Sequence, residues 1–390
     1  MKLRNQWRGP LTALGFLLGF VPAAQAVPAF SRKHDLVCSQ CHSAWPMLNK
    51  FGRDFKENGY RLEPGSAAPK ELAKIGEKLF LEKDVPLAAR IISRPVDKES
   101  GDARFKLRVA HELEVFLAGS AFKNVSFFAE FETEDENDWV PRVRFVTAGW
   151  HPTSKANIVG GWNSLFSADP YNSFADSRRL TAVHVATLLA PFAAGYGLSD
   201  EASTQYLTLY GRAKNLYYSA TAAAGASNLE GGDKRDFLLR AAYDFPGVSV
   251  GAFYLDGRTG LEDADLTAEW DRAGFDVQVE KGNFVANAVW YRAKDDVFAG
   301  PGRSKETNNA WYVQGFYAFK KDKEPLVVPF LRYESLQSND GRASTSSIAA
   351  AVVGYLTSNI SLSAEYWKQT AVPQGGNKDD RSVIQVAVAF

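Results

Sequence analysis

The two cysteines of this 390-residue chain lie three positions apart and are followed directly by a histidine, in Cys38-Ser39-Gln40-Cys41-His42. This spacing is the attachment pattern of a c-type haem. Each thiol forms a thioether with one vinyl group of the porphyrin, and the histidine then lies under the ring with its imidazole directed at the iron. The motif predicts one covalent haem c per chain, with His42 as an axial ligand.

Two other kinds of site use closely spaced cysteines. A thioredoxin-like redox dithiol requires a CxxC beside a βαβ pattern, and no such pattern surrounds Cys38 and Cys41 in the sequence. A structural zinc site requires four ligands, and the chain has no second pair of cysteines. The residues therefore favour the haem interpretation.

The second axial ligand has several candidates. His34 precedes His42 by eight residues, although it equally fits a solvent-facing position. Met47 follows His42 by five residues in a segment predicted to be helical, which would place it on the same side of the ring. Another residue of the chain, water or an open site are the alternatives. Arg53 and Lys56 could donate charge-assisted hydrogen bonds to the propionates, or lie on a solvated helix face. No catalytic acid, base or nucleophile is predicted.

The first 26 residues have the pattern of a secretory signal peptide. Three basic residues in the first eight positions precede the apolar run Leu11 to Val21, and Ala24-Gln25-Ala26 is a small-x-small cleavage site. No later apolar run is long enough for a membrane-spanning helix. Basic and acidic side chains balance at 45 each, so no nucleic-acid partner is predicted.

After about residue 84 the chain alternates apolar and polar residues. In residues 106–117 and 125–132 the alternation has a period of two, which predicts strands with one apolar face. About sixteen such strands start near residues 85, 105, 122, 140, 155, 206, 215, 236, 247, 264, 283, 309, 325, 345, 359 and 382. We expect residues 85–390 to form an all-β, porin-like outer-membrane barrel of antiparallel strands, in contact with membrane lipid.

The connections support the barrel because short and long ones alternate, as in outer-membrane barrels with short periplasmic turns. The alternation requires Asp265 to Glu280 to be one strand, kinked by a bulge at Ala273-Gly274. Residues 294–309 read as a long outer loop. The acidic run Glu132 to Glu136 is expected on another outer loop, where it either attracts a cation such as Fe(II) or is simply solvated. The connection near 163–203 either enters the lumen, caps the barrel or covers its surface.

Residues 27–84 are expected to form a small, mainly α-helical monohaem cytochrome c domain. The segment offers few apolar residues, so it needs the covalent haem and the barrel wall to complete its core. We expect it to dock at the periplasmic mouth or inside the lumen.

The motif and its flanks resemble a known family. Pro28-Ala29-Phe30-Ser31-Arg32 before CSQCH, and Pro46, Leu48, Phe51-Gly52-Arg53, Phe55-Lys56 and Gly59-Tyr60 after it, resemble the fused cytochrome–porins of the bacterial outer membrane. That family includes the outer-membrane iron oxidases of iron-oxidising bacteria. The resemblance covers about 35 residues, and it carries the haem role onto Cys38, Cys41 and His42 only. His34-Asp35-Leu36-Val37 departs from the family's pattern before the first cysteine, where members often carry Met, Gln or Tyr.

The resemblance implies electron transfer between an extracellular donor, Fe(II) in some members, and periplasmic carriers such as soluble c-type cytochromes. The protein would then be an electron carrier or an Fe(II)-oxidising oxidoreductase in the outer membrane. Two alternatives remain open at this point. One is a solute porin whose haem-bearing domain is a plug or gate, and the other is a haem enzyme with an open sixth site.

Overall fold

The computed structural model describes residues 28–62, 72–75, 79–82, 86–98, 104–122, 124–174, 180–189, 198, 204–224, 235–260, 267–299, 302–338 and 340–390. The predicted signal peptide at residues 1–26 lies outside this range. None of the helices in the described residues has the length and apolar character needed to cross a bilayer.

The N-terminal segment, residues 28–62, contains short helices and one two-stranded sheet. Its elements are α2 (Pro28–His34), α3 (Cys38–Cys41), β1 (His42–Ala44), β2 (Met47–Leu48) and α4 (Lys50–Glu57). The side chain of Asn49 caps α4 by accepting a hydrogen bond from the backbone N–H of Gly52. Because Met47 lies in β2, the predicted helix through that position is wrong. A separate hairpin follows, made of β3 (Leu72–Ile75) and β4 (Leu79–Glu82).

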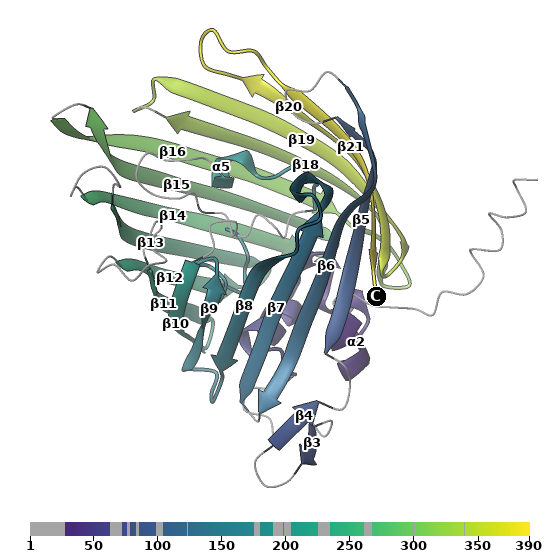
Figure 1. The fold of residues 1–390 in the computed structure, drawn as a ribbon. Coiled ribbons are helices and arrows are strands. Elements are labelled where there is room, and N and C mark those ends of the chain that lie inside the picture. The colour runs from purple at the N-terminus through teal and green to yellow at the C-terminus, as the bar shows by residue number, and fades with distance from the viewer. Residues whose placement is uncertain are drawn as a thin grey trace, which may run out of the picture.

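Residues 87–389 provide the strands of a closed antiparallel barrel (Figure 1). The strands are β5 (Leu87–Lys98), β6 (Lys106–Phe122), β7 (Val125–Glu134), β8 (Arg142–Trp150), β9 (Asn157–Asn163), β10 (Thr204–Ala213), β11 (Leu216–Ala224), β12 (Arg235–Phe245), β13 (Val248–Gly260), β14 (Thr267–Lys281), β15 (Phe284–Ala299), β16 (Gly302–Tyr317), β17 (Phe319–Lys321), β18 (Glu324–Ser338), β19 (Ala343–Thr357), β20 (Ile360–Ala371) and β21 (Asp380–Ala389). Two short helices lie between them, η1 (Asp135–Asn137) and α5 (Ala186–Leu189).

The predicted sixteen-stranded barrel is confirmed in the described residues. Strands β16 and β17 both pair with β18 and form one interrupted strand, and β21 pairs with β5 to close the barrel. The period of two is visible in β10, where Tyr206 and Tyr210 are buried inside and Leu207 and Leu209 are about half exposed outside. An apolar outer face and a mixed inner face are what a barrel in lipid requires.

Three local predictions are corrected. Residues 294–309 are not a loop, because β15 and β16 stay paired up to Ala299 opposite Gly302, and main-chain pairing does not need apolar side chains. Gly274 marks no bulge, since β14 keeps its register with both neighbours there. A glycine is needed because a Cβ would lie 2.5 Å from the carbonyl oxygen of Trp290. Glu132 to Glu134 belong to β7, not to a loop.

The long connection between β9 and β10 enters the lumen. Its residues Leu165, Phe166, Phe174, Val185, Leu188 and Leu198 form a buried cluster with inward side chains of β10–β16. Main-chain groups of the connection are also bound by the wall, since Glu365 accepts hydrogen bonds from the N–H groups of Ala182 and Val183. The described part of this connection therefore fills space in the middle of the barrel.

The N-terminal segment lies at the end of the barrel that carries the short turns. Arg61 donates hydrogen bonds to Asn124 and to the carbonyl oxygen of His151, two positions in short turns. Arg32 at the end of α2 donates to the carbonyl oxygen of Leu87, where β5 begins. Figure 1 shows α2 beside the C-terminus, at this same end.

Candidate functional site

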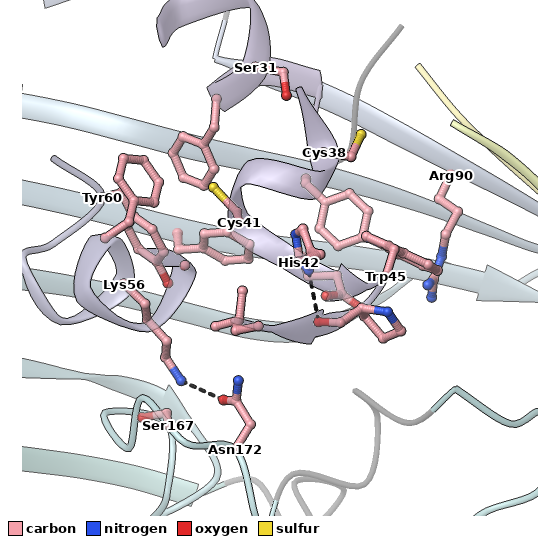
Figure 2. Close-up of a pocket in the computed structure, with 18 of the residues that line it drawn as sticks. Ser31, Cys38, Cys41, His42, Trp45, Lys56, Tyr60, Arg90, Ser167 and Asn172 are labelled. Atoms are coloured by element: carbon pink, nitrogen blue, oxygen red, sulfur yellow. Dashed lines mark hydrogen bonds between the residues drawn. The ribbon is translucent and has the colours of Figure 1, made fainter. Parts of the chain in front are cut away.

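Cys38, Cys41 and His42 lie together on one short stretch of chain. Both cysteines belong to the single turn of α3, and His42 is the first residue of β1. Cys38 is buried, Cys41 is half-buried, and the two are not joined by a disulfide. The three side chains border the same cavity (Figure 2). The structure thus brings the predicted motif residues to one place.

The ring of His42 has a defined orientation. Its Nδ1 lies 3.0 Å from the carbonyl oxygen of Pro46 (Figure 2). A carbonyl oxygen only accepts hydrogen bonds, so Nδ1 carries the proton. Nε2 of the neutral ring is then the unprotonated nitrogen, and this is the form of histidine that ligates a metal.

The N-terminal end of helix α4 packs against the CSQC turn and forms hydrogen bonds with it through its N-cap residue Asn49. The amide group of Asn49 donates to the carbonyl oxygens of Ser39 and Gln40, and its backbone N–H donates to Cys41. The two helices approach so closely at Gly52 that a Cβ there would lie 2.1 Å from the carbonyl oxygen of Cys41. The turn is therefore fixed by backbone contacts that need no bound group.

The cavity beside the motif lies between the N-terminal segment and the inner wall of β5–β8. It holds about 1320 Å³ of space, part of it open to solvent. Aromatic rings dominate its walls, and charged groups enter from several sides. The aromatic residues are Phe30, Trp45, Phe55, Tyr60, Phe116, Phe128, Phe145 and Phe166, and the charged ones are Lys56, Arg90, Glu114 and Glu130.

Cys38 and His42 also border a second cavity, with about 810 Å³ of space that is partly open to solvent. The turns at Lys321–Glu324 and Tyr355–Ser358 form its outer wall. Trp45 borders both cavities, and its carbonyl oxygen accepts a hydrogen bond from Tyr355. Cys38 and His42 therefore border two cavities at the end of the barrel that carries the short turns.

The residues present fit a covalently bound haem c. Two thiols and an oriented imidazole border one cavity, its lining is mostly apolar and includes eight aromatic residues, and the cationic side chains of Lys56 and Arg90 also line it. The Cys41 thiol is not activated, because burial and the neighbouring Cys38 raise its pKa to about 11. A catalytic redox dithiol needs a lowered thiol pKa, so the structure adds an argument against that alternative.

The other predicted site residues are distributed around the cavity. Lys56 lines it and donates to the carbonyl oxygen of Asp169 and to Asn172 (Figure 2). Arg53 is buried and forms an ion pair with Glu280 of β14. His34 packs edge-on against the ring of Phe55, with centroids 5.4 Å apart.

Neither candidate for the second axial ligand is among the residues that line the first cavity in the described part of the chain. His34 lies behind Phe55, and Met47 packs against the barrel-wall cluster that contains Val285 and Phe316. Their roles as ligands stay predictions.

Sequence reasoning missed the barrel residues that complete the site. Arg90 of β5 lies over the ring of Trp45, with its Cζ 4.8 Å from the centroid (Figure 2). Its guanidinium also forms an ion pair with Glu114 of β6. Glu130 of β7 lines the same cavity. The sequence does contain a signal that could have identified them. Arg90, Glu114 and Glu130 are charged residues on three successive predicted strands, at positions that face the lumen.

Comparisons with known proteins bear on the barrel. No family model and no curated protein sequence matches the chain. The anion-selective porin from Comamonas acidovorans has a similar structure over 78% of this chain and 98% of its own, at 14% identity and a TM-score of 0.60. Salmonella typhi OmpF in complex with daunomycin is similar over 78% of this chain and 97% of its own, at 15% identity and a TM-score of 0.58. The outer-membrane channel DcaP of Acinetobacter baumannii is similar over 78% of this chain and 95% of its own, at 14% identity and a TM-score of 0.54.

The chain has the fold of the outer-membrane porins. At these identities the comparison extends to the barrel architecture and not to what passes through it.

Proposed function

We propose that this protein is an outer-membrane electron carrier that moves single electrons across the membrane through one covalent haem c on Cys38 and Cys41. A bound haem c supplies a one-electron couple of its iron. The observation that carries the proposal is that both thiols and the oriented ring of His42 border one aromatic cavity inside the mouth of a membrane barrel.

The chain's own residues have separate tasks in this proposal. Cys38 and Cys41 would hold the group, and the hydrogen bond from Nδ1 to Pro46 would leave Nε2 of His42 as the nitrogen that ligates the iron. The aromatic residues of the lining would limit water around the ring, and Lys56 and Arg90, which also pairs with Glu114, would offer positive charge to the propionates. Arg53 serves docking instead, because its guanidinium pairs with Glu280 of the barrel wall.

The position of the motif in the barrel indicates which side of the membrane each redox partner would approach from. Short turns face the periplasm in outer-membrane barrels, and the site lies at the short-turn end, beside the second cavity. Periplasmic carriers such as soluble c-type cytochromes would therefore meet the site there. An extracellular donor, Fe(II) in the case that the resemblance implies, would approach from the side of the long connections.

A solute porin with a haem-bearing plug or gate is the second candidate, and the likeness to porins favours it. The contents of the lumen argue for the carrier instead. The described parts of the long connection and of the N-terminal segment occupy the middle and one mouth of the barrel. Conductance of the purified protein in planar bilayers separates the two, since a carrier needs no open channel.

The test of the proposal uses outer membranes from cells that also express the c-type haem maturation machinery. We expect a haem spectrum from the wild type and from Gln40→Ala, which keeps the CxxCH spacing at an exposed position. Cys38→Ser/Cys41→Ser should lose the covalent haem, and His42→Ala should change the spectrum. Fe(II) added to intact cells should reduce the haem promptly.

Three results would contradict the proposal. A wild-type protein without covalent haem rules out the cofactor. A haem that stays oxidised with Fe(II) but is reduced from the periplasmic side excludes iron as the donor and indicates outward electron export or gating. A five-coordinate haem that binds added ligands would indicate a haem enzyme with an open sixth site.

A further inference from the structure

Three glutamates on the inner wall of the barrel converge on one point. Glu112 and Glu114 lie on β6 and Glu132 lies on β7, and one carboxylate oxygen of each falls within 4.8 Å of the other two. Glu114 and Glu132 are buried, and Glu112 is half-buried. Buried carboxylates at this spacing repel one another unless a positive charge lies between or beside them.

The strand register places like charges face to face. Glu114 lies directly opposite Glu132 across the β6–β7 pair, and Glu112 lies directly opposite Glu134. Like charges at opposite positions destabilise a sheet. The repulsion within these two successive pairs destabilises the sheet, so other interactions must compensate for it.

Arginines offset only part of this charge. Arg90 pairs with Glu114, and Arg142 contacts Glu132 at 2.5 Å and Glu134 at 2.7 Å. Arg144 lies 3.6 Å from Glu132.

Positive charge near the cluster comes from several arginines. Arg90 pairs with Glu114, and Arg142 and Arg144 lie beside Glu132. Arg94 interacts electrostatically with Glu112, although its side chain bonds to Gln385. In the described residues, no guanidinium group lies within 4.0 Å of the Glu112 carboxylate.

One oxygen of the cluster is in an unusual position. Arg90 engages only one carboxylate oxygen of Glu114. The other oxygen, Oε2, is buried and has no hydrogen-bond partner in the described part of the chain, and the residue is 3% exposed. Leaving a buried carboxylate oxygen without a partner is unfavourable, because its lost hydration is not replaced. A ligand at this point would remove that cost.

We propose that Glu112, Glu114 and Glu132 bind a divalent cation that prefers oxygen ligands. Carboxylates suit ions such as Mg²⁺ and Mn²⁺, and the register brings the carboxylates of β6 and β7 opposite one another. Glu114 also lines the cavity beside Cys38 and His42, so the bound cation lies next to the proposed haem. The cation site itself does not rest on the proposed function, because none of its ligands touches the motif cysteines.

Mn²⁺ is the probe, since free Mn²⁺ gives a strong electron paramagnetic resonance signal that is lost on binding. The purified full-length protein in detergent is titrated with Mn²⁺. We expect one tight site in the wild type and at least a tenfold weaker affinity in Glu112→Gln and in Glu132→Gln. The matched control is Glu269→Gln, because Glu269 is a half-exposed carboxylate of β14 that pairs with arginines. It should bind as the wild type does.

The outcomes separate clearly. Absence of a stoichiometric site in the wild type, or equal affinity in Glu112→Gln and the wild type, overturns the proposal. If Glu132→Gln fails to reach the heat-resistant folded form on gels, Glu112→Gln decides, since no arginine contact within 4.0 Å is found for Glu112 in the described residues. Cys38→Ser/Cys41→Ser should still bind Mn²⁺, so failure of the haem proposal and failure of the cation proposal can be distinguished.

Discussion

The connection between β9 and β10 and the N-terminal segment both lie inside the barrel, but they meet its wall in different ways. The connection packs as a domain core does, with a continuous buried apolar cluster and a fully buried ion pair between its Asp169 and Arg240 of β12. The N-terminal segment is held at the mouth by polar contacts, such as the ion pair of Glu57 with Arg212, together with a smaller apolar contact of Ala44, Trp45 and Met47 with the wall, and it encloses a cavity.

The difference indicates a division of tasks. Close packing of the connection fills the middle of the lumen and supports the barrel from inside. The N-terminal segment keeps its contacts at the edges and leaves space around Cys38, Cys41 and His42. A bound group can enter only where the protein does not already fill the volume. The following predictions test each side of this comparison.

The largest effect is expected on the side of the connection. Arg240→Met removes the guanidinium that lies 2.6 Å from Asp276 and 3.4 Å from Asp169. Two buried carboxylates would lose their partner, so we expect a loss of about 3–5 kcal/mol in the free energy of unfolding. Urea unfolding in lipid vesicles, followed by tryptophan fluorescence, measures it. An unchanged midpoint would mean that this contact does not support the barrel.

The next effect concerns how the N-terminal segment is held. His151 accepts or donates hydrogen bonds at both ring nitrogens, to Tyr210 at 2.8 Å and Ser126 at 2.7 Å, and packs against Gly59. Burial, followed by the nearby Arg61, lowers the pKa of His151 to about 4. Because this value lies below the ordinary 6.5, the neutral ring stabilises the fold above pH 6.5, and the stabilisation is lost as the pH falls toward 4.

The loss over that range is on the order of 3 kcal/mol. Hydrogen exchange of residues 50–60, measured by mass spectrometry between pH 7.5 and 4.5 with correction for intrinsic rates, should show falling protection. His151→Gln, which cannot take up the proton, should flatten the profile. If wild type and variant follow the same pH profile, another group holds the segment.

A smaller effect is expected inside the N-terminal segment. In Gly52→Ala the new methyl group would clash with the carbonyl oxygen of Cys41, so α4 must move away from the CSQC turn. We expect a cost of about 1–3 kcal/mol and a lower ratio of covalent haem to protein. Gly354→Ala is the control, because the nearest atom there is 3.8 Å away. Equal haem ratios in the two variants would show that the turn tolerates the shift.

The smallest effect is expected where neither region is touched. Arg258 on β13 is 61% exposed and lies 3.7 Å from Glu269. Exposed pairs contribute about 0–1 kcal/mol, so Arg258→Met should unfold within that range of the wild type in the same urea assay. A loss as large as that of Arg240→Met would mean that burial does not decide which ion pairs matter here.

Much of the barrel could be predicted from the sequence, because the alternation of apolar and polar residues that marks a strand is a local pattern. Alternation in a segment such as Tyr206 to Tyr210 needs only neighbouring residues to be visible, and the strand number followed from such segments. The extent of the strands was harder to predict. The polar residues 294–299 and 302–309 look like a loop, but they continue a hydrogen-bonded ladder that does not depend on side-chain polarity.

The sequence by itself determined the sixteen strands and the three residues of the CxxCH motif, since both depend on spacing along the chain. Tertiary structure alone decided that the long connection enters the lumen, that Arg90 reaches Trp45, and that Glu114 faces Glu132. The physical reason is that closure of the barrel sets the register between distant strands. That register decides which charges meet, which are paired, and where a cavity remains.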